Sequence, residues 1–328
     1  MTTTAGGISG APDRSAPSRS HPSDTHPDLV PLREAAARGD WPATAAFFAR
    51  LDTEEERSFA SGLLAEVDGV EGYLEAASAD HPGDPLPRTL LAERYVHIGW
   101  AIRSRAMAEH VSREQFTSFH SWLRRAEQVL IEVCAEHPAS AHAWTVRVTT
   151  ARGLELGAAE ARRRYDRLSA HHPHHYPAQT QLLQNVYPKW GGSWEAAHGF
   201  ARECATEAPD GSHAGALVAT AHVEHWAELE GARRATYLRD VAIRDDLRFA
   251  ARVSVLHPAY RPRFHGTGAH GVFALAFALG GHHADALPHF RELDAPPPDS
   301  PWHYFSDPPA VFAKYRHAAL SAARGESR

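Results

Sequence analysis

Residues 136–209 read EHPASAHAWTVRVTTARGLELGAAEARRRYDRLSAHHPHHYPAQTQLLQNVYPKWGGSWEAAHGFARECATEAP, and this stretch decides the fold. A proline closes an apolar-periodic segment three times in it, at Pro138, Pro173 and Pro209. Pro173 follows Pro138 by 35 positions, and Pro209 follows Pro173 by 36. Because proline breaks a helix interior, we expect each of them to lie between two helices. A unit of about 34 residues is typical of helix–turn–helix repeats.

A second sequence pattern, which we call the glycine–small–aromatic mark, lies between these prolines and recurs near the N-terminus. It consists of a glycine, a small residue four positions later and an aromatic residue eight positions later. The matching triplets are Gly39-Ala43-Phe47, Gly157-Ala161-Tyr165 and Gly192-Ala196-Phe200. We expect the glycine to end the first helix of a pair, the small residue to let two helices approach, and the aromatic ring to fill the layer between repeats.

Helical signals continue outward from this stretch. Apolar residues recur at three- and four-residue spacing, as in Leu123, Ala126 and Leu130, which is the stripe of an amphipathic helix. Capping boxes begin at Thr53 and Ser112. No segment alternates apolar and polar residues long enough to predict a strand. The sequence therefore predicts an all-α fold of antiparallel helix pairs.

The chain divides into a tail and one helical domain. Residues 1–27 are rich in Ser, Thr, Pro and Gly and hold almost no large apolar side chains, so we expect a disordered tail. Residues 28–325 form the predicted helical-repeat domain, with the best-defined repeats at about 130–230. Aromatic runs late in the chain indicate capping helices at about 239–323, because the end of a solenoid must be covered.

The motif Tyr187-Pro-Lys-Trp-Gly-Gly-Ser-Trp194, followed by a helix ending in FARE, resembles a signature of uncharacterised bacterial helical-repeat proteins. Ala143-Trp144, shortly after a His-Pro pair, fits the same resemblance, which covers about residues 85–230. More broadly, the chain resembles a divergent tetratricopeptide-repeat (TPR) protein. This resemblance implies a right-handed solenoid and no particular activity.

Composition narrows the classes of partner. The 328 residues carry a formal net charge of −6 and 43% hydrophobic residues, without a long run of like charge. We therefore expect no nucleic-acid partner and no membrane partner. The longest apolar run, residues 272–279, is too short to span a bilayer, and no secretory signal is visible. These features predict a cytoplasmic protein, and the bias toward arginine over lysine suggests a bacterial, GC-rich genome.

The turn at 187–194 is the strongest candidate for a binding site. Lys189 and Trp190 there are predicted to stand at the mouth of a groove for an anionic or peptidic ligand. Alternatively, Trp190 and Trp194 only staple a tight turn onto the core. The predicted groove residues are His142, Trp144, Tyr187, Lys189, Trp190 and Trp194.

Two other patterns are weaker. The chain has 24 histidines, and His222 and His225 are spaced to share a helix face, but no recognised zinc motif accompanies them. We therefore expect no metal and no cofactor. Residues 266–271 match GxGxxG, yet two prolines precede them where a dinucleotide fold needs a buried strand. The alternatives at that loop are a plain flexible loop, or glycine N–H groups at a helix N-terminus that bind a phosphate or carboxylate with Arg261 or Arg263 nearby.

Two hypotheses for function follow. The first is a protein- or peptide-binding scaffold, because a TPR-like superhelix offers a concave groove. The second is an enzyme or a small-molecule or metal-binding protein, with a pocket assembled from His142, Trp144, Lys189 and Trp190, to which His222 and His225 could add. No catalytic acid, base or nucleophile can be named from the sequence, which favours the first.

Overall fold

A computed structural model describes residues 26–104, 110–297 and 301–326. Within these ranges the chain forms helices and their connections, without a β-strand, so the predicted all-α class is confirmed. The predicted tail, residues 1–27, lies almost wholly outside the described ranges. No helix in the described part of the chain is both long enough and apolar enough to cross a bilayer.

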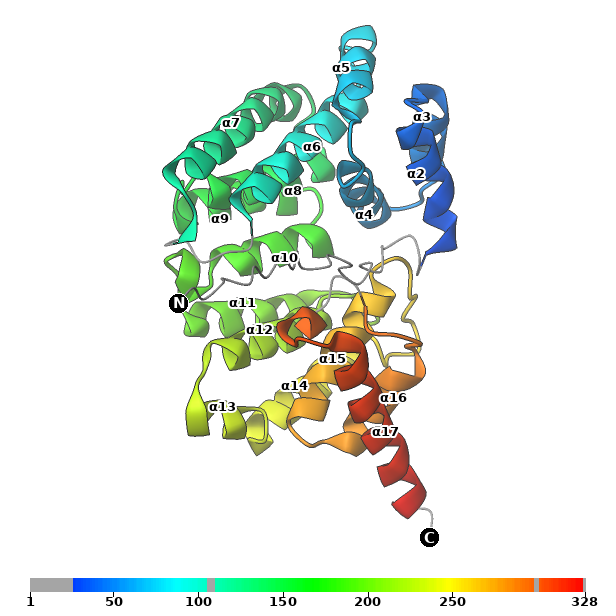
Figure 1. The fold of residues 1–328 in the computed structure, drawn as a ribbon, viewed down its shortest axis with the longest axis vertical. Helices are drawn as coiled ribbons and strands as arrows, with labels where there is room; N and C mark the ends of the chain where they lie inside the picture. The colour runs from blue at the N-terminus through cyan, green and yellow to red at the C-terminus, as the bar shows by residue number, and fades with distance from the viewer. Residues whose placement is uncertain (1–25, 105–109, 298–300, 327–328) are drawn as a thin grey trace, which may run out of the picture.

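The helices follow one another along the long axis of the molecule (Figure 1). The N-terminal ones are η1 (Pro27–Leu29), α2 (Val30–Ala37), α3 (Trp41–Ala49), α4 (Glu54–Ala65) and α5 (Glu71–Asp80). The middle ones are α6 (Pro85–Arg103), α7 (Arg113–Glu136), α8 (Ala141–Gly153), α9 (Ala158–Ser169), α10 (Tyr176–Asn185), η3 (Pro188–Trp190), α11 (Trp194–Glu207) and α12 (Gly215–Glu228). The C-terminal ones are α13 (Gly231–Tyr237), α14 (Val241–Val253), α15 (Gly266–Leu279), α16 (His283–Arg291), η4 (Pro301–Tyr304) and α17 (Pro308–Glu326).

Helix boundaries follow the local sequence signals. Both capping boxes form, at the starts of α4 and α7, and satisfy backbone N–H groups that have no partner inside the helix. Pro138 lies between α7 and α8, Pro173 between α9 and α10, and Pro209 between α11 and α12. The predicted positions of these prolines are therefore confirmed.

The glycine–small–aromatic mark is confirmed only in part. Its aromatic residues Phe47, Tyr165 and Phe200 are all buried, and the rings of Tyr165 and Phe200 meet edge to face at 5.6 Å between α9 and α11. The small residue was assigned wrongly in the third triplet, because Ala196 is exposed and the next residue, Ala197, is fully buried.

Two series of helices pack against each other. α6, α8, α10, α12 and α15 contact one another in succession, and α7, α9, α11 and α16 each pack against a neighbour in that series. α4 also packs against α6, α8 and α10. One continuous core of Leu, Ala, Val and aromatic side chains runs through these layers. Cys134 and Cys204 are free and buried in it, and burial raises the pKa of these thiols to about 11 and about 12 respectively.

Candidate functional site

The turn between α10 and α11 depends on its two glycines. Gly191 closes η3 in the left-handed conformation, at φ +87°. A Cβ atom on Gly192 would lie 2.0 Å from the carbonyl oxygen of Val186, while the N–H of Ser193 donates to that same oxygen at 3.0 Å. The Gly-Gly pair therefore lets the chain double back tightly, and Ser193 then caps α11.

The aromatic residues around this turn divide into two roles. Tyr187 is fully buried, and its ring lies 5.3 Å from that of Trp194. Trp194 in turn stacks on His225 at 4.4 Å, with the rings almost parallel. These contacts fit the alternative in which aromatic side chains staple the turn to the core. Trp190 differs, because it is only half-buried and faces a groove.

The groove has a volume of about 1200 Å³. Its wall is made mainly by the C-terminal ends of α6, α8, α10 and α12, which lie along one edge of the helix stack, with η3 and η4. The side chains that line it include Trp100, Phe119, Arg152, Lys189, Trp190, Glu224 and Tyr304. Lys189 and Trp190, which the sequence analysis singled out, therefore both line this groove.

Arg152 lies at the α6–α8 end of the groove, against two tryptophans. Its guanidinium carbon is 5.4 Å from the ring centre of Trp100 and 5.9 Å from that of Trp190. The two rings meet at right angles, 6.1 Å apart. Only one hydrogen bond is donated by this guanidinium to the described residues, to the carbonyl of Gln181 at a long 3.5 Å. Burial lowers the pKa of Arg152 to about 10, which leaves it charged at neutral pH.

Acidic and phenolic groups occupy the other end. Lys189 Nζ pairs with Glu224 at 3.1 Å, and the Tyr304 hydroxyl donates to the same carboxylate at 2.6 Å. Burial and the nearby Glu224 charge raise the pKa of Tyr304, so its hydroxyl stays protonated. The groove thus has a cationic end at Arg152 and an internally paired end at Glu224.

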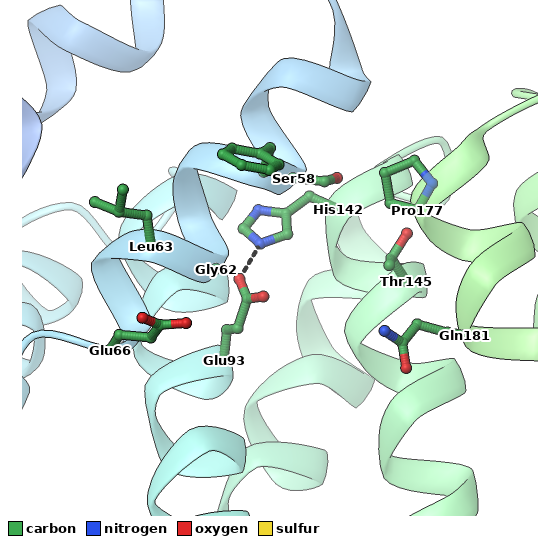
Figure 2. A pocket seen from close by; sticks show the side chains of 10 residues that line it. Ser58, Gly62, Leu63, Glu66, Glu93, His142, Thr145, Pro177 and Gln181 are labelled. Carbon is green, nitrogen blue, oxygen red and sulfur yellow. Dashed lines mark hydrogen bonds and ion pairs between the residues drawn. The ribbon is translucent and has the colours of Figure 1, made fainter. Parts of the chain in front are cut away.

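His142 lies elsewhere, in a separate cavity of about 220 Å³ between α4, α6, α8 and α10 (Figure 2). Its Nε2 is 2.8 Å from a carboxylate oxygen of Glu93, and Ser61 Oγ donates a short hydrogen bond to that oxygen. The serine hydroxyl is therefore directed at the carboxylate and not at the imidazole, so the three groups do not form a nucleophile–base pair.

Trp144 also lies outside the groove. Its indole N–H donates to the carbonyl of Pro138 at 2.9 Å, and Arg147 lies over its ring at 5.0 Å. It borders a third cavity of about 360 Å³ on the α7–α9 face. The six residues predicted to form one groove therefore lie in separate places, and only Lys189 and Trp190 line the large groove.

The histidines considered for metal binding gather around a tyrosine. The Tyr237 hydroxyl is within 2.9 Å of both His222 Nδ1 and His225 Nδ1, and His198 Nε2 lies 3.3 Å from it. His222 Nε2 shares a hydrogen bond with Asp246 at 3.0 Å. Across the described ranges, no three or more His, Cys, Asp and Glu side chains are placed to hold a metal ion.

The GxGxxG match forms the first turns of α15 and is preceded by an irregular segment, not a strand. Both arginines considered for phosphate binding at this loop already have partners. Arg263 pairs with Glu56 and, at 3.1 Å, with Asp52, while Arg261 donates to backbone carbonyls.

No protein-family model matches the chain, and no curated protein matches its sequence. The resemblance of residues 187–194 to a family of helical-repeat proteins therefore stays a prediction.

Sequence reasoning missed most of the groove. Trp100, Arg152, Glu224 and Tyr304 come from four elements far apart along the chain. One signal was available in retrospect: each of the first three lies in the last turns of a helix, at the same edge of the stack as the turn that carries Trp190. Tyr304 had no such signal, because it belongs to η4.

Proposed function

We propose that this chain is a protein- or peptide-binding scaffold with a TPR-like right-handed solenoid, working in a bacterial cytoplasm. The observation that carries the proposal is the groove at the ends of α6, α8, α10 and α12. Its volume of about 1200 Å³ exceeds the roughly 300–1,000 Å³ of ordinary small-molecule pockets. An extended peptide segment is the ligand class that a groove of this volume suits.

The lining supports the same ligand class. Trp100, Trp190 and Tyr304 present large rings with polar groups, and tryptophan, tyrosine and arginine dominate the binding energy at peptide and protein interfaces. The alternative function, an enzyme or small-molecule binder, needs His142, Trp144, Lys189 and Trp190 in one pocket. These residues lie in three separate cavities, so no single pocket supports that alternative.

The test is selection of peptides from a random display library on the full chain, followed by affinity measurement with synthetic peptides. We expect Trp190→Ala to raise the Kd of selected peptides about tenfold or more, the usual cost of truncating an interface aromatic. Trp122→Ala is the matched control. Trp122 is also half-buried beneath an arginine, Arg125 at 4.5 Å, but it lies outside the groove.

Two outcomes would count against this function. One is a library from which no peptide is enriched on the folded protein. The other is a set of peptides that bind wild type and Trp190→Ala equally well.

A further inference from the structure

We infer that the groove contains an anion subsite at Arg152, which takes a carboxylate or phosphate group of the ligand against the walls formed by Trp100 and Trp190. This inference rests on the proposed binding function and names the chemical class of ligand that the groove takes. The case for it comes from the surroundings of Arg152.

Arginine side chains in this protein are generally paired when they are buried. Arg88, Arg94, Arg147 and Arg164 are each nearly buried, and each pairs with one or two carboxylates. Arg152 is the contrast. It is half-buried between two indole rings, and no carboxylate among the described residues pairs with it. A guanidinium has five N–H donors, and this one makes a single, long hydrogen bond to the described residues, at 3.5 Å.

The rings of Trp100 and Trp190 hold the Arg152 guanidinium in place before a ligand binds. Two cation–π contacts restrain its position without using its N–H donors. The donors stay available in the plane of the group, which is the geometry for two parallel hydrogen bonds to a carboxylate or phosphate. The indole N–H of Trp100 is buried and has no hydrogen-bond partner among the described residues.

The C-terminal ends of helices repel an anion, so their effect must be compared with the attraction of Arg152. The C-termini of α6, α8, α10 and α12 face the groove, and each disfavours an anion by about 0.3–1 kcal/mol where exposed, falling off within the last turn. A hydrogen bond that involves a charged group contributes about 1.5–3 kcal/mol, and a bidentate pair makes two of them. Arg152 therefore outweighs the helix ends at its own position.

The neighbouring cations are already engaged. Lys189 pairs with Glu224, and Glu224 also accepts from Tyr304. Arg103 also lines the groove, with its guanidinium 6.0 Å from the ring centre of Trp100, and it donates to the carbonyl of Ser104 at 3.0 Å. Lys189 and Arg103 are therefore engaged, whereas Arg152 keeps open donors among the described residues. An oxyanion that enters the groove is therefore expected to bind at Arg152.

The experiment uses the full chain labelled with ¹⁵N at tryptophan, and the probes are sodium acetate and sodium phosphate. Indole resonances of Trp100 and Trp190 are assigned by Trp→Phe variants. The titrations run to about 50 mM against sodium chloride at equal ionic strength, because an isolated small ion is expected to bind with a Kd in the millimolar range. We expect saturable shifts of both resonances with at least one of the two oxyanions and not with chloride.

Variants separate the subsite from general effects. Arg152→Gln is expected to raise the apparent Kd at least tenfold, and Arg152→Lys to raise it several-fold, because lysine keeps the charge but loses the fork. Arg162→Gln is the matched control. Arg162 also lies over an aromatic ring, Tyr165 at 5.8 Å, but is outside the groove, so its loss is expected to leave the titration unchanged.

The outcomes are distinct. A response to acetate identifies a carboxylate subsite, a response to phosphate identifies a phosphate subsite, and a response to both supports their shared chemistry. Equal shifts with chloride, or shifts that persist in Arg152→Gln with the other indole resonances unmoved, overturn the inference. If Arg152→Gln does not fold, Arg152→Lys takes its place. Since no peptide is used, this result stands apart from the library selection that tests the proposed function.

Discussion

At the scale of single residues, the candidate site depends on positions where only one residue type fits. Gly192 has no room for a side chain, because the carbonyl of Val186 occupies the position that a Cβ would take. Close approach at this point brings η3 and Trp190 to the edge of the groove. A steric requirement within one turn therefore determines where the binding surface can form.

Gly192→Ala is expected to destabilise the protein by about 2 kcal/mol or more, since the backbone of the turn must move to relieve the clash. Urea unfolding at neutral pH measures the change. Gly199→Ala is the control on the adjoining helix, where a Cβ meets nothing within 4 Å. It should be neutral or raise the free energy of unfolding by up to about 1 kcal/mol, because alanine is the better helix former. Equal stabilities for the two variants would show that the turn has room after all.

At the scale of helices, the groove forms where α6, α8, α10 and α12 end. α8 ends at Gly153, whose missing side chain leaves space for Leu123 and Phe119 of α7. This contact brings the end of α8, with Arg152, close to the groove-lining Phe119. The packing of successive helices therefore positions the binding residues, and the contact between α9 and α11 shows how neighbouring pairs are joined.

Tyr165 and Phe200 are expected to be energetically coupled, because their rings meet edge to face across those two helices. A double-mutant cycle with Tyr165→Leu and Phe200→Leu should give a coupling energy of about 0.5–1.5 kcal/mol. Phe47→Leu combined with Phe200→Leu is the control, since Phe47 lies in α3 at the far end of the stack (Figure 1). That pair should be additive within about 0.5 kcal/mol. Additivity in both pairs would contradict a direct contact.

At the scale of the whole molecule, α4 joins segments that are distant in sequence. Glu55 accepts from the backbone N–H of Tyr176 at 3.2 Å and lies 3.3 Å from His213 Nδ1. Ser58 Oγ lies 3.2 Å from His175 Nε2, and Glu56 pairs with Arg263. These contacts tie α4 to the α10, α12 and α15 regions, so the N-terminal helices are part of the same packed unit as the C-terminal ones.

Such contacts mark the limit of prediction from sequence. Helix class, both capping boxes and the prolines between helices, Pro138, Pro173 and Pro209, were predictable, because each depends on local chemistry. The pairing of Trp190 with Trp100 and Arg152 was not, since it depends on how helices far apart in the chain come together. For the same reason the sequence did not show that His142, Trp144 and Lys189 line three different cavities.

Histidine burial gives the molecule a characteristic response to acid. Burial lowers the pKa of His175 and His270 to about 4 and that of His198 and His265 to about 3. Burial also holds the pKa of His289 well below its ordinary value, because this ring is packed against Phe273 and Phe277. In the unfolded chain the same side chains bind protons near pH 6.5. Between about pH 6.5 and 4 the unfolded state therefore holds more protons than the folded state.

Stability is consequently expected to be full above about pH 6.5 and to be lost as the pH falls toward 4, by up to about 1.4 kcal/mol per pH unit for each such histidine. Urea unfolding at pH 7.5, 6.0 and 5.0 measures this slope. His289→Leu should reduce the slope by about the share of one histidine. His317→Gln should leave it unchanged, because His317 is exposed. A free energy of unfolding that is flat or rises on acidification would show that these imidazoles are protonated in the folded protein, and that its histidine-rich core is open to water.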